Sequence, residues 1–261
     1  MPKSDSSRLL AEGRRRMILE FVEQSGQVTI HDLVKRFAVS AVTARGDLDA
    51  LSARGMVLRS HGGAVRYEPT QDYPLRVKAT LHHAEKQRIG AAAAQLVRPN
   101  ETIILDSGTT TSEIAQCLKR AKLRITVITN ALNIANDLVD VPEVALFMVG
   151  GLLRPVSNSF VGPQAEAMLR ELHADRLFLG VDGLDLEGGP FTADVLEAQL
   201  NGLMMTVSRE VTVVADSTKL GRRSLFRIGP IANVHRVITD EHAPKSLTDT
   251  LRKKGIEVTL V

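Results

Sequence analysis

The run from Leu105 to Ile114 is the stretch of the sequence best suited to binding chemistry. An apolar segment stops at an acid, and a turn rich in hydroxyl side chains then begins a helical pattern. Backbone N–H groups at a helix start point outward, and the helix dipole favours negative charge there. The residues that could surround a phosphate are Asp106, Ser107, Gly108, Thr109, Thr110 and Thr111. The alternative is a simple capping box of Thr110 and Glu113, but a capping box needs one hydroxyl and this turn offers four.

Four other apolar segments end in similar turns. These turns contain Thr129 with Asn130, Gly150 with Arg154, Asp182 with Gly183, and Asp216 with Lys219. Carboxylates can accept hydrogen bonds from sugar hydroxyls, and the ammonium group of Lys219 can pair with a phosphate. If the strands are adjacent and parallel, all of these turns lie at one edge of a sheet, where ligands bind in such folds. The sequence thus predicts a site for a phosphorylated sugar, with no cofactor, no metal and no catalytic residue.

The elements that would position these turns are short apolar segments separated by helical stretches. The segments are residues 102–105, 125–128, 144–149, 177–181, 211–214 and 234–238. Continuous β-branched segments that alternate with helices indicate a largely parallel sheet covered on both faces. We therefore predict an α/β domain over residues 81–261, preceded by a linker at 68–80 that contains two prolines.

The first 67 residues have a different pattern. An amphipathic helix is expected at 8–24, with Arg14, Arg15 and Arg16 largely facing water. A second helix opens at Thr29, and a third opens at Ser40 after a tight turn, with Val42, Leu48 and Leu51 facing inward. Two β-prone runs around Gly62 and Gly63 then predict a hairpin, so the whole segment reads as a winged helix-turn-helix. The alternative, a purely structural three-helix bundle, would explain neither the wing nor the charge distribution. The expected DNA contacts are Thr29, Ser40, Thr43, Arg45, Arg59 and His61.

Charge is distributed unevenly along the chain. Residues 1–66 contain 11 Lys and Arg against 7 Asp and Glu, whereas the rest contains 22 against 23. Clustered positive charge is typical of a nucleic-acid-binding module, although a solvated basic face would look the same. The single cysteine, Cys117, excludes an internal disulfide. No stretch has the apolar length of a signal peptide or a membrane span, so a cytoplasmic protein without membrane association is expected.

Two groups of motifs carry a resemblance to a known family. The segment VSAVTARGDLDALSARGMVLRSHGGA, residues 39–64, resembles the N-terminal signature of the DeoR family of sugar-metabolism repressors. The segments DSGTTTSEIA, TNALNIAN, ADRLFLGVDGLDLEGG and VADSTKLGRRSLF resemble the effector domain of the same family, which is similar in fold to ribose-5-phosphate isomerase. Within the family the chain looks most like repressors of N-acetylgalactosamine and related amino-sugar operons. The resemblance implies a homo-oligomer, a dimer or tetramer, that binds double-stranded operator DNA and is released by a sugar phosphate.

Four positions depart from the family pattern. Ala44 and Gly46 replace an isoleucine and an arginine of the recognition helix, and Gly46 is expected to weaken that helix. In the segment 191–201 the family's histidine and one glutamate are replaced, and Glu197 is the surviving acid expected near the sugar. These departures leave the operator sequence and the preferred sugar open.

Two rival functions agree less well with the sequence. A sugar-phosphate isomerase of this fold would have a lysine in the Gly-rich loop after the Asp182-Gly183 turn, but residues 184–194 contain none. A DNA-binding protein that uses its C-terminal domain only to oligomerise would not need five phosphate-type turns. We therefore expect ligand binding to change the spacing of the winged helices, although the sequence leaves open whether the ligand releases or holds the operator.

Overall fold

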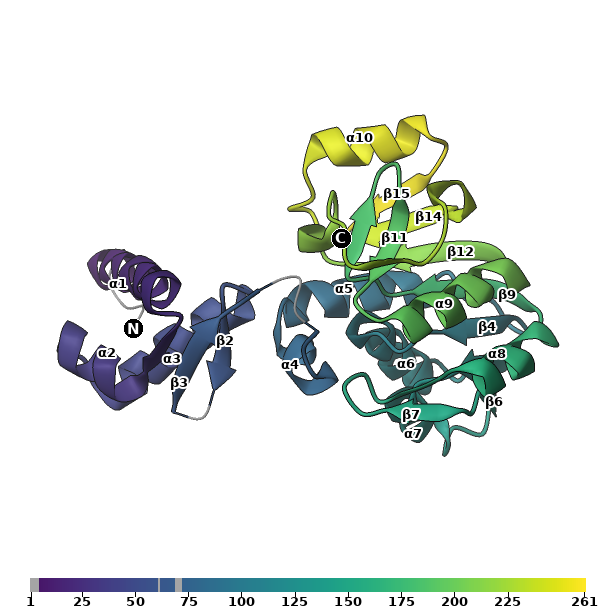
Figure 1. The fold of residues 1–261 in the computed structure, drawn as a ribbon, viewed down its shortest axis with the longest axis horizontal. Coiled ribbons are helices and arrows are strands. Elements are labelled where there is room, and N and C mark those ends of the chain that lie inside the picture. The colour runs from purple at the N-terminus through teal and green to yellow at the C-terminus, as the bar shows by residue number, and fades with distance from the viewer. Residues whose placement is uncertain (1–4, 61, 69–71) are drawn as a thin grey trace. The chain divides into compact units, whose positions relative to one another are not determined.

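The computed structural model describes residues 5–60, 62–68 and 72–261 (Figure 1). The chain divides into two compact units. One contains residues up to Pro69 together with Thr80–His83, and the other contains Thr70–Ala79 and Ala84–Val261.

The smaller unit has three helices and a three-stranded antiparallel sheet in the order β1-β3-β2. Its elements are α1 (Asp5–Ser25), β1 (Gln27–Thr29), α2 (Ile30–Phe37), α3 (Ala41–Ala53), β2 (Val57–Ser60) and β3 (Gly63–Arg66). Thr29 and Asp32 form the expected reciprocal cap of α2, because each side chain accepts from the other's backbone N–H at 3.0 to 3.1 Å. The predicted winged helix-turn-helix is therefore confirmed.

One of the three positions of α3 that were predicted to face inward is exposed in the structure. Ala44, Leu48 and Leu51 are fully buried, whereas Val42, which we expected to face inward, is 76% exposed. The buried positions follow a helical stripe of i, i+4 and i+7, and residue 42 lies outside that stripe. Ala44 thus occupies a core position, and a small side chain suffices there.

Two arginines of α1 that were expected to face water instead tie α1 to α3. Arg14 and Arg15 both pair with the carboxylate of Asp47, at 2.5 and 3.0 Å, and Asp47 is only 2% exposed. A buried carboxylate needs such partners, because an unpaired buried charge is strongly destabilising. These arginines therefore have a structural task.

The larger unit is built on a seven-stranded sheet, in the order β15-β14-β12-β9-β4-β5-β6, in which all pairs are parallel. The strands are β4 (Thr102–Leu105), β5 (Ile125–Thr129), β6 (Val144–Met148), β9 (Ala174–Leu179), β12 (Ser208–Val214), β14 (Arg236–Thr239) and β15 (Glu257–Leu260). The predicted α/β fold with a largely parallel sheet is confirmed, although β15 was not predicted.

Both faces of this sheet are covered by helices (Figure 1). Residues of α5 (His83–Ala94), α6 (Thr109–Ala121) and α7 (Leu132–Leu138) form one core, and residues of α8 (Pro163–Arg170), α9 (Val195–Val207) and α10 (Lys245–Lys253) contribute to the other. Strand β4 supplies both cores, with Ile103 and Leu105 on one face and Ile104 on the other. This alternation explains why β4 is apolar throughout.

Smaller elements extend the carboxyl edge of the sheet. The hairpin of β7 (Leu152–Arg154) and β8 (Ser159–Val161) follows β6, and β10 (Gly183–Asp185) with β11 (Gly189–Thr192) follows β9. Strand β13 (Phe226–Arg227) pairs with β11, and two short 3-10 helices lie at Ser217–Lys219 and Ile231–Asn233.

The predicted linker at 68–80 differs from the structure in its second half. Residues Leu75–Thr80 form a helix, α4, and the backbone N–H of Leu75 donates to the carbonyl of Val156 in the larger unit at 2.7 Å. After α4 the chain returns to the smaller unit. There Leu81 is 4% exposed and the N–H of His82 donates to the carbonyl of Ala53 at 3.2 Å.

Candidate functional site

The recognition helix α3 carries the exposed residues that could read DNA. Arg45 and Gly46 are exposed, and no heavy atom lies within 4 Å of the position that a Cβ on Gly46 would occupy. Ser40 caps the helix by accepting from the N–H of Thr43 at 3.1 Å, and the two hydroxyls lie 2.9 Å apart. This end of α3 therefore offers a cation and two hydroxyls.

The other expected DNA contacts are differently placed. The hydroxyl of Thr29 donates to Asp32 at 2.6 Å. Arg59 on the wing pairs with Asp49 at 2.9 Å and donates to the carbonyl of Gly63 at 2.6 Å. His61 lies outside the described residues. Thr29 and Arg59 thus have internal partners that a DNA phosphate would have to replace.

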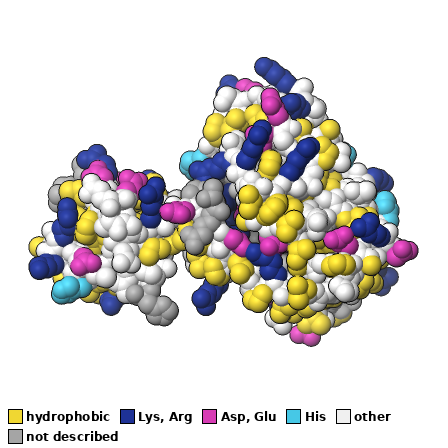
Figure 2. All heavy atoms as spheres, in the orientation of Figure 1, with side chains coloured by type: hydrophobic (Ala, Val, Ile, Leu, Met, Phe, Trp, Pro, Cys, Tyr) yellow, Lys and Arg dark blue, Asp and Glu magenta, His cyan; other side chains and the backbone are white. Residues whose placement is uncertain are grey.

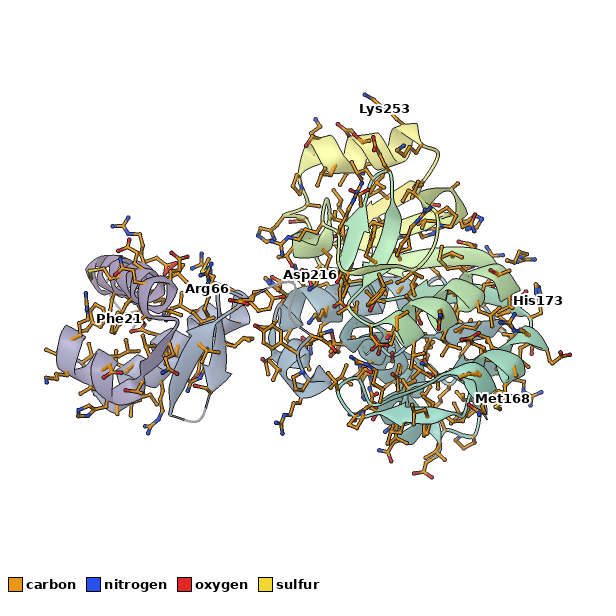
Figure 3. The ribbon with its side chains drawn as sticks, viewed as in Figure 1. Phe21, Arg66, Met168, His173, Asp216 and Lys253 are labelled. Carbon is orange, nitrogen blue, oxygen red and sulfur yellow. The ribbon has the colours of Figure 1, made fainter. Side chains whose placement is uncertain are left out.

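The five predicted turns meet at one edge of the larger sheet. They follow β12, β9, β4, β5 and β6, which are adjacent and parallel in that order. Figure 3 shows the two edges, with Asp216 after β12 on one side and His173 before β9 on the other. The chain runs outward from β4 in one direction and from β9 in the other, so the edge between these strands is the topological switch point where α/β folds bind ligands.

Asp106 connects the ends of β4 and β9. Its carboxylate accepts from the backbone N–H of Gly180 at 2.9 Å and from that of Gly108 at 3.1 Å. Burial raises the pKa of Asp106 to about 7 despite these bonds, and the nearby Glu197 contributes to the rise. Asp106 therefore fixes the shape of the loop, and its expected contact with the ligand stays a prediction.

Helix α6 begins beside this carboxylate without a capping side chain. Gly108 is its N-cap and has no side chain that could accept from the first-turn amides. The hydroxyl of Thr111 accepts from the N–H of Gly108 at 2.9 Å and lies within 3.0 Å of the carbonyls of Asp106 and Gly108. Thr111 thus has a structural role. Ser107 and Thr109 are half-buried and Thr110 is buried.

Two other turns are engaged internally. The hydroxyl of Thr129 donates to the carbonyl of Leu105 at 2.7 Å, and the amide of Asn130 donates to the carbonyl of Phe160 at 3.0 Å. A Cβ on Gly183 would lie 2.6 Å from the carbonyl oxygen of Arg222, so this glycine permits close packing of two chain segments. Nothing lies within 4 Å of a Cβ built on Gly150.

Arg154 is the centre of an ionic cluster on the hairpin. It pairs with Asp72, with Asp194 at 3.2 Å and with Glu197 at 3.5 Å. Glu197 also accepts from the hydroxyls of Ser159 at 3.2 Å and Thr192 at 3.3 Å. The cluster joins the expected residues Arg154 and Glu197 with two acids that we did not predict.

Lys78 joins this cluster to the turn after β9. Its ammonium group lies 3.1 Å from Asp182 and 3.2 Å from Asp72. Burial alone would lower the pKa of Lys78, but the two carboxylates outweigh burial and raise it. Asp182 correspondingly has a lowered pKa, because Lys78 and Lys219 offset its burial.

Lys86 on α5 is a further cation that the sequence prediction missed. It is 5% exposed, its ammonium group donates to the carbonyl of Lys78 at 2.5 Å, and it interacts electrostatically with Asp216 and Lys219. Burial lowers the pKa of Lys86 to about 8. A signal was available, because residue 86 lies on the same helical stripe as the buried Ile89 and Ala93.

Asp216 and Lys219 complete the edge. The carboxylate of Asp216, 2% exposed, accepts from the N–H of Thr218 at 3.1 Å and so starts the 3-10 helix that carries Lys219. Among the described residues, Lys219 has no carboxylate within ion-pair distance, although its charge acts on Asp182 and Lys86. The edge thus brings together a bare helix start and three lysines.

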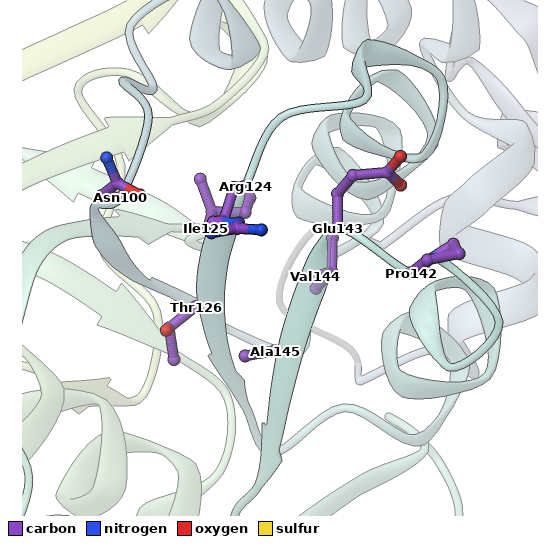
Figure 4. A pocket seen from close by; sticks show the side chains of 8 residues that line it. All are labelled: Asn100, Arg124, Ile125, Thr126, Pro142, Glu143, Val144 and Ala145. Atoms are coloured by element: carbon purple, nitrogen blue, oxygen red, sulfur yellow. The ribbon is translucent and has the colours of Figure 1, made fainter.

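A separate open hollow of about 400 Å³ lies at the opposite edge (Figure 4). It is lined by the amino ends of β5 and β6, including Arg124 and Glu143. None of the predicted site residues lines it. In the part of the chain that the structure describes, no group of His, Cys, Asp and Glu is arranged to hold a metal, and no helix is long and apolar enough to cross a membrane.

Comparisons with known proteins match both units. Residues 14–70 match the family model of the DeoR-like helix-turn-helix domain, and residues 81–241 match that of the DeoR C terminal sensor domain. The putative aga operon transcriptional repressor of Escherichia coli O157:H7 is 41% identical over 251 residues, which cover 95% of this chain and 93% of that protein. The glycerol-3-phosphate regulon repressor of Escherichia coli K12 is 32% identical and covers 95% of this chain and 98% of its own length.

Among solved structures, ribose 5-phosphate isomerase A of Methanocaldococcus jannaschii aligns with a TM-score of 0.40 and 17% identity over 53% of this chain and 55% of its own.

Proposed function

Because this chain belongs to the DeoR family of transcriptional regulators, we propose that it represses a carbohydrate operon and is released from its operator by a phosphorylated sugar. Each of the two units has one of these functions. Residues 1–67 bind double-stranded DNA in the cytoplasm, and residues 81–261 sense the sugar. The single observation that carries the proposal is the start of α6 at the switch point between β4 and β9.

The phosphate fits this helix start for physical reasons. Gly108 leaves the first-turn amides without a side-chain acceptor, and the helix dipole favours an anion there. Lys219 and Lys86 can approach as cations, and Ser107, Thr109 and Thr110 can donate hydroxyls. Charge-assisted hydrogen bonds of this kind contribute ~1.5–3 kcal/mol each.

The sugar ring would then lie among the carboxylates that surround Arg154, which are those of Asp72, Asp194 and Glu197, and beside Asp182. Asp182 and Glu197 are acceptors for its hydroxyl or amino groups, and Arg154 holds Glu197 in place. An amino-sugar 6-phosphate is the best-supported class, because the aga operon repressor is the relative with 41% identity. Ala193 and Asp194, in the segment that departs from the family pattern, adjoin Asp182 and Arg154, so the preferred sugar can differ from that of relatives.

A homo-oligomer is part of the proposal, since symmetric dimers or tetramers read paired half-sites. Exposed hydrophobic side chains support it. Figure 2 shows such side chains on the surface of the larger unit. Phe147 on the edge strand β6 is 39% exposed, and Leu152 and Leu153 on β7 are 64% and 41% exposed. Apolar groups of this size at a sheet edge suit burial against a second copy.

Thermal unfolding with added ligands tests the proposed sensing. We expect N-acetylgalactosamine 6-phosphate or galactosamine 6-phosphate to raise the melting temperature, since a ligand at 100 times its dissociation constant stabilises the folded state by ~2.7 kcal/mol. The unphosphorylated sugars should do far less, and Lys219→Ala should lose most of the shift while it still binds DNA. Equal shifts from both kinds of sugar would contradict the proposed phosphate site.

A further inference from the structure

Ion pairs and hydrogen bonds join residues 72–79 to the sensing site. Asp72 pairs with Arg154 and lies 3.2 Å from Lys78, which in turn lies 3.1 Å from Asp182. Two backbone contacts add to these, from the N–H of Leu75 to Val156 and from the ammonium group of Lys86 to the carbonyl of Lys78. Helix α4 has no fully buried side chain.

Such a segment can be displaced by a competing anion. Apolar burial would hold it whatever the ionic surroundings, but ion pairs between partly exposed groups contribute little and are exchangeable. The side chains of Asp72, Lys78 and Arg154 are 24%, 27% and 17% exposed, so solvent and solutes reach them. The carboxylate of Asp72 presents anionic oxygens to the same cations that a phosphate would seek.

Displacement of residues 72–79 would affect the winged-helix unit, because the segment is joined to that unit at both of its ends. Residues up to Pro69 and residues Thr80–His83 both belong to the winged-helix unit. Both ends of the segment 72–79 therefore continue into the DNA-binding unit. A change in what holds the segment is transmitted along the backbone in two directions.

We propose that Asp72 is an internal competitor of the effector, and that the bound sugar phosphate takes over Arg154 and so releases Asp72 and the residues that follow it, 72–79, from the sensing unit. The proposal rests on the proposed function, because it assumes that a sugar phosphate binds at this edge. Residues 72–79 then transmit the effect of ligand binding to the winged-helix unit. In the ligand-free protein, Asp72 keeps the segment docked on the sensing unit.

Hydrogen–deuterium exchange of the whole 261-residue chain tests the binding of a sugar phosphate and the displacement of residues 72–79 separately. The probes are N-acetylgalactosamine 6-phosphate, galactosamine 6-phosphate and inorganic phosphate. Peptides that cover residues 106–112 should exchange more slowly with a bound probe, while peptides that cover residues 72–80 should exchange faster. Slower or unchanged exchange of residues 72–80, together with protection of residues 106–112, would overturn the displacement and leave the sensing function standing. If no probe protects residues 106–112, the sensing function fails and the displacement fails with it.

A matched pair of variants tests the role of Asp72 itself. Asp72→Asn should bind the phosphorylated probes at least about fivefold more tightly, since the competing charge is gone, and its residues 72–80 should exchange fast without ligand. Asp194→Asn removes another acid from Arg154, and asparagine can still cap α9, where Asp194 accepts from the N–H groups of Leu196 and Glu197. Its residues 72–80 should stay protected until a probe binds. Equal exchange of residues 72–80 in the two ligand-free variants would refute the assignment to Asp72.

Discussion

Replacement of Lys86 by methionine should stabilise the protein and abolish its response to sugar phosphates. The pKa of Lys86 is lowered from 10.5 to about 8 by burial, and each unit of pKa corresponds to ~1.4 kcal/mol. The buried charge thus costs ~3 kcal/mol at pH 7. Loss of the 2.5 Å hydrogen bond to the carbonyl of Lys78 offsets ~1–2 kcal/mol of the gain. We expect a net stabilisation of ~1–2 kcal/mol, or roughly 2–8 °C for a unit of this size.

The Lys86→Met substitution should also change how the stability of the folded state depends on pH. Below pH 8 Lys86 is charged in both the folded and the unfolded state, so the folded state bears the full burial cost. Between about pH 8 and 10.5 the folded state has lost the proton and the unfolded state still holds it, so stability rises with pH across that window. Lys86→Met should lack this rise. A bound phosphate favours the charged amine, so the ligand-induced shift of the wild-type protein should shrink above about pH 8.

Circular dichroism during thermal and urea unfolding measures both effects. Lys253→Met is the control, because Lys253 is exposed on α10, at the far edge of the unit in Figure 3, and such surface changes usually stay within ~0.5 kcal/mol. If Lys86→Met is less stable than this control, or responds to a phosphorylated sugar like the wild type, Lys86 is a structural residue and our reading of its burial is wrong.

Four other outcomes are expected. Arg45→Ala should leave the fold unchanged and weaken DNA binding by at least ~1 kcal/mol, measured by fluorescence anisotropy with a duplex selected from a random pool. Equal affinities of the variant and the wild type across a salt series would contradict this expectation. Gly46→Arg has open space around its Cβ and should raise the melting temperature, since glycine costs ~1 kcal/mol in a helix interior, and a lower value would count against the assigned geometry. Asp47→Ala should cost ~2 kcal/mol in urea unfolding, less than a fully buried pair, because Arg14 and Arg15 are 20% and 30% exposed; a loss below ~0.5 kcal/mol would show that the pairs are dispensable. Purified protein should not isomerise ribose 5-phosphate, and product formation proportional to protein concentration would overturn the assignment as a regulator.

The ends of the strands could be predicted because their signals are local. An apolar segment that stops at Asp106 and continues into a hydroxyl-rich turn shows both where β4 ends and where α6 begins. The same holds for Thr29 and Asp32, whose three-residue spacing gives the cap of α2 directly. Parallel pairing then follows from the helices between the strands.

The ion pairs of the site could not be predicted in this way. Lys78 and Asp182 are 104 residues apart, and Asp72 and Arg154 are 82 apart. Only the packed fold brings such pairs together. Residues 72–79 resembled a linker because their contacts are polar and long-range, which leaves no apolar periodicity. The error at Val42 has another origin, since a short helix allows two registers and only the packing against α1, α2 and β2 selects one.

The return of the chain to the winged-helix unit at Thr80–His83 limits how the two functions can be separated or recombined. A fragment that ends before residue 80 would leave out the buried Leu81 and the bond from His82 to Ala53, and with them part of its own core. A hybrid regulator with a foreign sensor would need these four residues from the DNA-binding parent and the preceding segment from the sensor parent. Recombination at a single point cannot satisfy both requirements, so sequence drift within an intact gene is a more accessible route to a new effector than exchange of whole domains.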